Sequence, residues 1–153
     1  MAGLSTLCAG MNVPARLTAA LLCASLLAVG LEACGNTVST SGFKGEAHEV
    51  AQAIANLQTD ATARDEKKVC ENDLASAVVK RLSSATGGCK QAIKTQLAEV
   101  DGFEVSVQSV QLGASATPRT ATAQVKSIYQ GKTRSGTLSL VKEGGKWKVS
   151  SVG

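Results

Sequence analysis

The residues that could carry acid–base chemistry are few and scattered along the chain. Acid–base catalysis requires a general base, usually a carboxylate, and a hydrogen-bond donor such as tyrosine in a dry pocket. Tyr129 is the sole tyrosine, and it lies near the end of an expected strand, where the ring commonly packs at the core edge with its hydroxyl in water. The candidate carboxylates are Asp65, Asp73, Asp101 and Glu104. No two of these groups form a motif by their spacing.

The remaining motifs of catalysis are missing from the sequence. His48 is the only histidine, and it lies in the polar part of an expected helix, where a solvated side chain is the default. The chain contains no Gly-x-Ser-x-Gly, no phosphate-binding loop and no His/Asp nucleophile arrangement. We therefore predict that the protein is not an enzyme and has no catalytic residues and no cofactor.

An uncharged run of 14 residues, from Leu17 to Gly30, follows the positive charge of Arg16. A membrane-spanning helix needs about 20 apolar residues, so this run is short for a span and has the length of a signal-peptide core. We predict that residues 1–33 are a signal peptide, and Met11 is an alternative start that gives a better-proportioned charged region.

The sequence Leu31-Glu32-Ala33-Cys34 resembles the lipobox of bacterial lipoproteins. In that motif a small residue precedes a cysteine whose thiol takes a lipid and becomes the new N-terminus. Glu32 departs from the pattern, since the residue at that position is usually small or uncharged. We predict lipidation of Cys34 and a flexible tether up to Gly45, so that residues 34–45 form a lipidated N-terminus. The alternative is cleavage after Gly30 and simple secretion.

Two of the five cysteines, Cys70 and Cys89, remain when the signal peptide and Cys34 are set aside. An even remainder in an exported chain favours a disulfide, which would contribute about 3 kcal/mol for a loop of this length. Two thiols and one histidine are too few ligands for a zinc site, so we predict no bound metal.

Composition excludes some classes of partner. Aromatic residues make up 3% of the chain, which argues against nucleic-acid binding by base stacking. The net charge is +4, and the last third of the sequence is the basic part. Its basic residues are Arg119, Lys126, Lys132, Arg134, Lys142, Lys146 and Lys148, against the single acidic residue Glu143. A basic face could meet anionic lipid or an acidic partner, but lysines on solvated strands are the more common explanation.

Hydrophobic periodicity predicts an α+β domain over residues 46–153. Helices are expected over residues 46–57, 65–82 and 89–100, with residues 60–64 as a break and the second helix allowed to divide in two. Alternation of apolar and polar residues then predicts strands over residues 103–112, 118–129, 132–142 and 147–152. A change of phase predicts a bulge near Gln108 or Ser109, and the sequence from Glu143 to Lys146 predicts a hairpin turn.

This order of elements, closing with Val141-Lys142-Glu143-Gly144-Gly145-Lys146-Trp147-Lys148-Val149, resembles the NTF2-like superfamily, in particular its small secreted or lipid-anchored bacterial members. The resemblance covers roughly residues 46–152 and implies a curved antiparallel sheet wrapped around N-terminal helices, with a cone-shaped cavity. It also implies that Trp147 packs structurally. Many members of the superfamily dimerise through the sheet, some are isomerases, dehydratases or hydrolases, and many only bind ligands or proteins.

Three functions are compatible with this reading. The leading hypothesis is a lipid-anchored domain on the outer face of the cell membrane that binds a small apolar ligand or an envelope protein. The alternatives are an exported enzyme of the isomerase or dehydratase type, which a pocket holding Tyr129 beside a buried carboxylate would favour, and an accessory subunit of an envelope assembly. A cone filled by its own side chains would count against ligand binding.

Overall fold

The computed structural model describes residues 38–99, 104–115, 117–129 and 131–153. The helical elements come first: α1 (Glu46–Thr62), α2 (Glu66–Lys68), the π-helical turn η1 (Val69–Asp73), α3 (Ser76–Ser83) and α4 (Gly88–Ala98). The strands follow: β1 (Glu104–Leu112), β2 (Thr120–Tyr129), β3 (Lys132–Glu143) and β4 (Lys146–Val152). Each strand pairs antiparallel with the next, in the order β1-β2-β3-β4. The α+β class predicted from the sequence is therefore confirmed.

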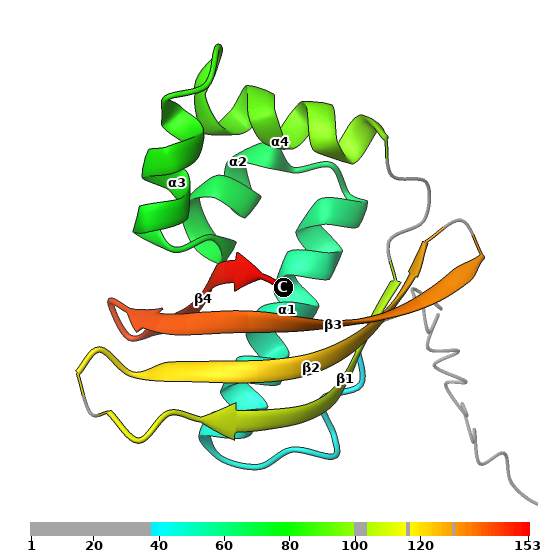
Figure 1. Ribbon diagram of the computed structural model, residues 1–153, viewed down its shortest axis with the longest axis vertical. Coiled ribbons are helices and arrows are strands. Elements are labelled where there is room, and N and C mark those ends of the chain that lie inside the picture. The colour runs from blue at the N-terminus through cyan, green and yellow to red at the C-terminus, as the bar shows by residue number, and fades with distance from the viewer. Residues whose placement is uncertain (1–37, 100–103, 116, 130) are drawn as a thin grey trace, which may run out of the picture. The chain divides into compact units, whose positions relative to one another are not determined.

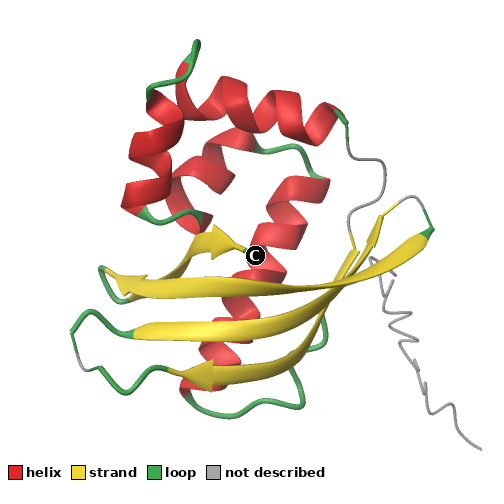
Figure 2. Ribbon diagram, viewed as in Figure 1, coloured by secondary structure: helices red, strands yellow, loops and turns green. Residues whose placement is uncertain are grey.

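The helices and the sheet form two layers. Figure 1 shows α1 passing behind the curved sheet, while α2, α3 and α4 lie beyond the edge that β4 forms. The same division into a helical layer and a strand layer is visible in Figure 2. The inner face of the sheet carries the buried side chains of Val105, Ala121, Ala123, Val125, Leu138, Leu140, Trp147 and Val149.

Helix α1 supplies the other half of the core. Val50 and Ile54 are 0% and 1% exposed, and they lie one turn apart on the predicted apolar face. The predicted end near residue 57 was too early, because Gln58 and Ala61 continue the buried face. The helix therefore runs on to Thr62, into the segment that was expected to break it.

The second predicted helix divides, as the sequence allowed. Leu74 and Ala75 leave the helical conformation because they run beside β4, where the Ala75 N–H donates to the Val149 carbonyl at 2.9 Å. Helix α3 begins immediately afterwards. Its first N–H, from Ser76, donates to the Glu143 carboxylate at 3.0 Å, and the Ser76 hydroxyl donates to the same group at 2.7 Å. The cap of α3 is therefore the side chain of Glu143, at the end of β3.

The turns of the sheet agree with the sequence. The register of β1 against β2 shifts between Val107 and Ser109, where the bulge was predicted. Gly144 and Gly145 turn the chain between β3 and β4 with φ angles of 56° and 79°, which glycine adopts without steric cost. The last predicted helix, residues 89–100, corresponds to α4, although residue 100 lies outside the described residues.

The packed domain begins ahead of α1. Val38 is 6% exposed and belongs to the same buried cluster as Val50 and Ile54. Part of the segment that was predicted to be a flexible tether up to Gly45 therefore packs in the core. The predicted signal peptide, residues 1–33, and the predicted lipid site, Cys34, lie outside the described residues.

Candidate functional site

A polar cleft lies between α1, η1 and the β3–β4 turn. Its volume is about 570 Å³, and its lining includes Gln52, Asn56, Asp60, Asn72, Asp73 and Trp147. The local structure explains why these residues meet. The Leu74–Val149 bridge fixes the end of η1 against β4, and the Lys148 ammonium donates to the Glu71 carbonyl at 2.8 Å. Asp73 is thereby held near the start of β4, where Trp147 is buried.

Among the candidate carboxylates in the described residues, Asp73 has the pKa that departs most from its ordinary value. It is 6% exposed, and burial raises its pKa from 3.8 to about 7, with a further contribution from the negative charge and hydrogen bonding of Asp60. Lys148 and Lys68 act in the opposite direction but do not outweigh burial. Asp73 therefore holds its proton over a range in which an exposed carboxylic acid has lost it.

Two buried polar atoms of this cleft lack hydrogen-bond partners. They are Asp73 Oδ2 and Trp147 Nε1, and within the part of the chain that the structure describes no other buried side-chain nitrogen or oxygen is in this state. The sequence singled out Asp73 only as one of four carboxylates. The meeting of Asp73 with Asp60 and Trp147 in one cleft could not be read from spacing, since the three residues come from three different elements.

The backbone of Tyr129 lies at the far end of β2 from the strand positions nearest this cleft. Cross-strand pairing places Ala121 of β2 opposite Leu140, and Leu140 opposite Val149, which is beside Leu74. Tyr129 lies eight positions along β2 from Ala121, a distance of about 26 Å at the usual rise of a strand. The side chain of Tyr129 lies outside the described part of the chain, so its combination with a buried carboxylate, which would favour an enzyme, stays untested.

Among the other candidate residues, Asp65 and His48 have partners in the structure. Asp65 accepts a hydrogen bond from the Lys68 N–H at 3.0 Å, which lowers the pKa of Asp65 and caps α2. His48 is half-buried, with Nδ1 3.2 Å from the Thr40 carbonyl oxygen, so it is less solvated than expected. Glu104 lies at the start of β1, and Asp101 lies outside the described residues.

A second, apolar pocket lies between α1 and the concave face of the sheet. Its volume is about 220 Å³, and the apolar side chains that line it are Ile54, Leu57, Val105, Val125, Leu138 and Val152. The space exists because two inner positions of the sheet carry small residues, Ser127 and Gly136, beside Val125. The cone is therefore not completely filled by its own side chains.

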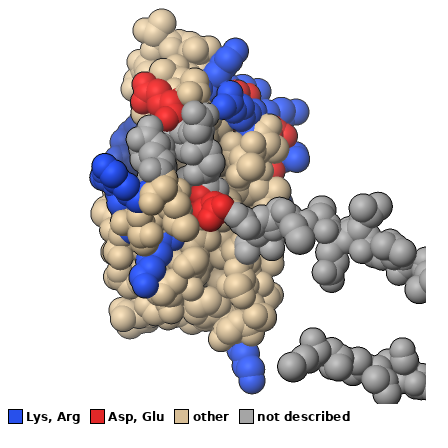
Figure 3. All heavy atoms as spheres, turned by 90° about the vertical axis from the view of Figure 1, so that its right-hand side faces the viewer, with Lys and Arg blue, Asp and Glu red and all other residues tan. Residues whose placement is uncertain are grey.

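Two of the basic residues in the last third of the chain form ion pairs with acidic residues of α1. Lys142 binds Glu46 and Glu49 with Nζ–O distances of 3.1 and 2.8 Å, and Arg119 binds Glu46 as well. The pKa of Glu46 is lowered mainly by the hydrogen bond from Lys142 and, to a smaller extent, by the one from Arg119. Lys142 Nζ also lies 5.6 Å from the centre of the Trp147 ring. On the face drawn in Figure 3, basic side chains form separate groups, with acidic ones among them, above a broad uncharged area.

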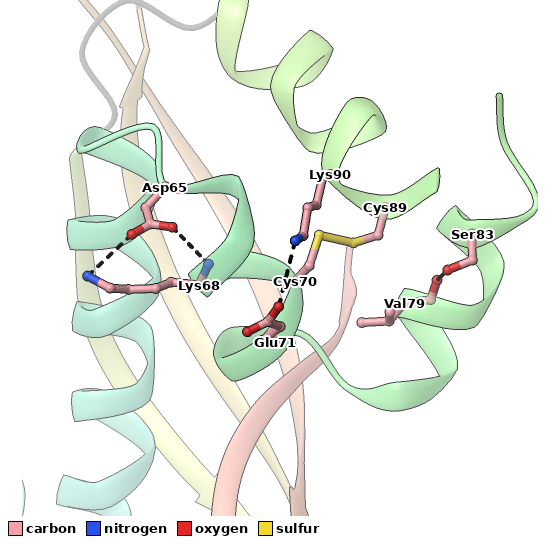
Figure 4. The surroundings of a disulfide bond; sticks show 8 residues. All are labelled: Asp65, Lys68, Cys70, Glu71, Val79, Ser83, Cys89 and Lys90. Carbon is pink, nitrogen blue, oxygen red and sulfur yellow. Dashed lines mark hydrogen bonds and ion pairs between the residues drawn. A yellow bond between two sulfur atoms is a disulfide. The ribbon is translucent and has the colours of Figure 1, made fainter. Parts of the chain in front are cut away.

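The cysteines expected to pair do so. Cys70 of η1 and Cys89 of α4 form a disulfide with their Cα atoms 6.3 Å apart, and both side chains are buried. Figure 4 shows this bond beside an ion pair between Lys90 and Glu71, whose charged atoms are 3.7 Å apart. Together they hold η1, and hence Asp73, against α4.

The described residues contain no group of three or more His, Cys, Asp or Glu side chains arranged to hold a metal ion. Among the helices in the described ranges, none is long and apolar enough to cross a bilayer.

Comparisons with known proteins give a likeness of fold only. No protein-family model and no curated protein sequence matches the chain. A solved structure of a designed NTF2 protein aligns with 66% of this chain and 91% of its own, with 18% sequence identity and a TM-score of 0.41. A likeness of this strength gives no indication of activity.

Proposed function

We propose that this chain is an exported, lipid-anchored domain of the NTF2-like type that acts by binding a small apolar ligand, and not by catalysis. The observation that supports it is the apolar pocket between α1 and the sheet. None of the side chains that line this pocket is titratable. A dry apolar cavity of about 150 Å³ already admits a molecule such as benzene, so a pocket of 220 Å³ has room for a small apolar guest.

The proposed anchor would keep this pocket close to the membrane. Cys34 precedes the buried Val38 by four residues, and four extended residues reach at most about 14 Å. A lipid on Cys34 would therefore hold the domain close to the bilayer, into whose hydrocarbon core small apolar molecules partition.

The binding step can be tested with benzene as the probe and two variants of one strand. Ser127→Phe fills the pocket from its inner wall, whereas Thr122→Phe places the same ring on the opposite face of β2. We expect benzene to shift the methyl NMR signals of Ile54 and Leu138 in the wild type and in Thr122→Phe, and not in Ser127→Phe. Equal shifts in all three proteins, or none in the wild type, would contradict the proposal.

The anchor is tested separately by replacing Cys34 with Ala in the native host and comparing membrane and soluble fractions. The proposal expects the variant to leave the membrane fraction. Retention at the wild-type level would show that Cys34 is not the anchor.

An exported enzyme of the isomerase or dehydratase type is the second candidate, because a carboxyl group with a pKa of about 7 suits general acid–base catalysis. Ligand recovered from the wild type and from Asp73→Asn separates the two functions. Chemically identical ligand from both supports binding alone, whereas unconverted material from the variant only would support catalysis by Asp73.

A further inference from the structure

The polar cleft presents two buried groups whose hydrogen-bonding needs are complementary. Trp147 is 5% exposed and Asp73 is 6% exposed, and both side chains line the cleft. Trp147 Nε1 can only donate a hydrogen bond, whereas Asp73 Oδ2 accepts one when the carboxyl group is ionised and can donate one when it carries the proton. Leaving either buried group unpaired is unfavourable, so the cleft favours a guest that satisfies both.

The charges around the cleft select the class of guest. An ammonium group has no acceptor for the indole N–H, and an anion would face Asp60 and Asp73 together. Two lysines line the cleft: the Lys68 ammonium is already engaged, 3.6 Å from Asp60 and 3.4 Å from Asp65, whereas Lys146 is exposed to solvent. The Glu49 carboxylate also lines the cleft and adds to its negative charge. A hydroxyl group both donates and accepts, and it carries no charge.

The rest of the lining extends the same chemistry. The Gln52 amide donates to the Asn56 side-chain oxygen at 3.1 Å, and this bond uses neither the Gln52 side-chain carbonyl nor the Asn56 NH₂ group. Asn72 adds a further amide at the rim. The cleft volume of about 570 Å³ lies within the range of small-molecule sites, about 300–1,000 Å³. It is far larger than the volume of one water molecule, which is about 30 Å³.

We infer that the cleft between α1, η1 and the β3–β4 turn binds a neutral polyhydroxylated ligand, a saccharide, through the Trp147 indole N–H and the Asp73 carboxyl group. Ring hydroxyls replace the missing partners of these two atoms, and the amides of Gln52, Asn56 and Asn72 bind hydroxyls farther out. This inference does not depend on the apolar pocket, because the two sites share none of their lining residues.

Trp147 is the sole tryptophan, so its indole N–H gives a single, assigned NMR signal inside the proposed site. The probes are a panel of hexoses, N-acetylated amino sugars and disaccharides, with methyl phosphate and ethanolamine as the anionic and cationic comparisons. We expect a saturable shift of the indole signal with at least one saccharide. A shift with methyl phosphate or ethanolamine but no saccharide, or no shift with any probe, would overturn the inference.

Variants then test which atoms bind. Trp147→Phe keeps a ring in the core and removes the N–H, and Asn72→Ala shortens an exposed residue of the lining. Saccharide affinity, measured by calorimetry, should fall about 10-fold in Trp147→Phe and less in Asn72→Ala. The matched control Gln96→Ala, on exposed α4, and the pocket-filling Ser127→Phe should bind as the wild type does. Unchanged affinity in both cleft variants would place the saccharide elsewhere and refute the site.

Discussion

Asp73→Asn should make the protein more stable at neutral pH and should remove part of its pH dependence. In the folded chain Asp73 keeps its proton up to about pH 7, whereas in the unfolded chain it releases the proton near pH 3.8. Between these values folding requires proton uptake, so this group makes the folded state less stable as the pH rises. The amide of asparagine cannot ionise, so the variant lacks this contribution.

The magnitude follows from the two pKa values. Each pKa unit corresponds to about 1.4 kcal/mol, so a rise from 3.8 to about 7 amounts to about 4 kcal/mol when Asp73 is fully ionised. The groups that face Asp73 are Asp60 from α1, Lys68 from α2 and Lys148 from β4. They are unchanged in the variant, so the difference between the two proteins isolates Asp73.

The assay is urea unfolding followed by Trp147 fluorescence at a series of pH values from about pH 4 to above about pH 7. Relative to the wild type, the free energy of unfolding of the variant should increase steadily with pH across this range, by up to about 4 kcal/mol. At the acid end of the range the two proteins should have the same free energy of unfolding. Glu66→Gln, a carboxylate of the neighbouring helix α2, is the control and should follow the wild type. Parallel curves for the wild type and Asp73→Asn would refute the reasoning.

Three further predictions concern how the site is held. Replacing Cys70 and Cys89 together by serine should lower the free energy of unfolding by about 3 kcal/mol in denaturant titrations, and unchanged stability would argue against a structural bridge. Glu143→Ala should lower it by about 1 kcal/mol and speed hydrogen exchange in α3, because the helix loses its cap; unaltered exchange would contradict this role. Lys142→Met should raise the pKa of Glu46 in an NMR titration, and an unchanged pKa would show that the ion pair does not form in solution.

Much of the fold was predictable because it is encoded locally. The strict alternation from Val105 to Val107 and its change of phase predicted both β1 and its bulge. The glycines at positions 144 and 145 predicted the last turn, since their backbone conformation suits glycine. The end of α1 was missed because Gln58, a polar residue, is buried there and its side-chain oxygen accepts a hydrogen bond from the Val105 N–H at 3.0 Å.

The two pockets were not predictable, because both depend on contacts between distant segments. The raised pKa of Asp73 depends on its burial, which arises when η1 is fixed against β4. Nothing in the neighbouring sequence distinguishes Asp73 from Asp65, whose pKa is lowered. A weak signal did exist for the apolar pocket. Ser127 and Gly136 occupy inner positions of their strands, and small residues in such positions leave space that the sequence pattern alone does not interpret.

Native mass spectrometry of the protein extracted from its own envelope, beside the Ser127→Phe variant, tests the proposed function most directly. The account predicts an acylated wild-type chain that carries an additional small apolar molecule, and an acylated variant without it. A wild-type chain with no bound molecule, or the same bound mass on both proteins, would contradict binding in the pocket between α1 and the sheet. A chain without the acyl group would contradict the anchor at Cys34.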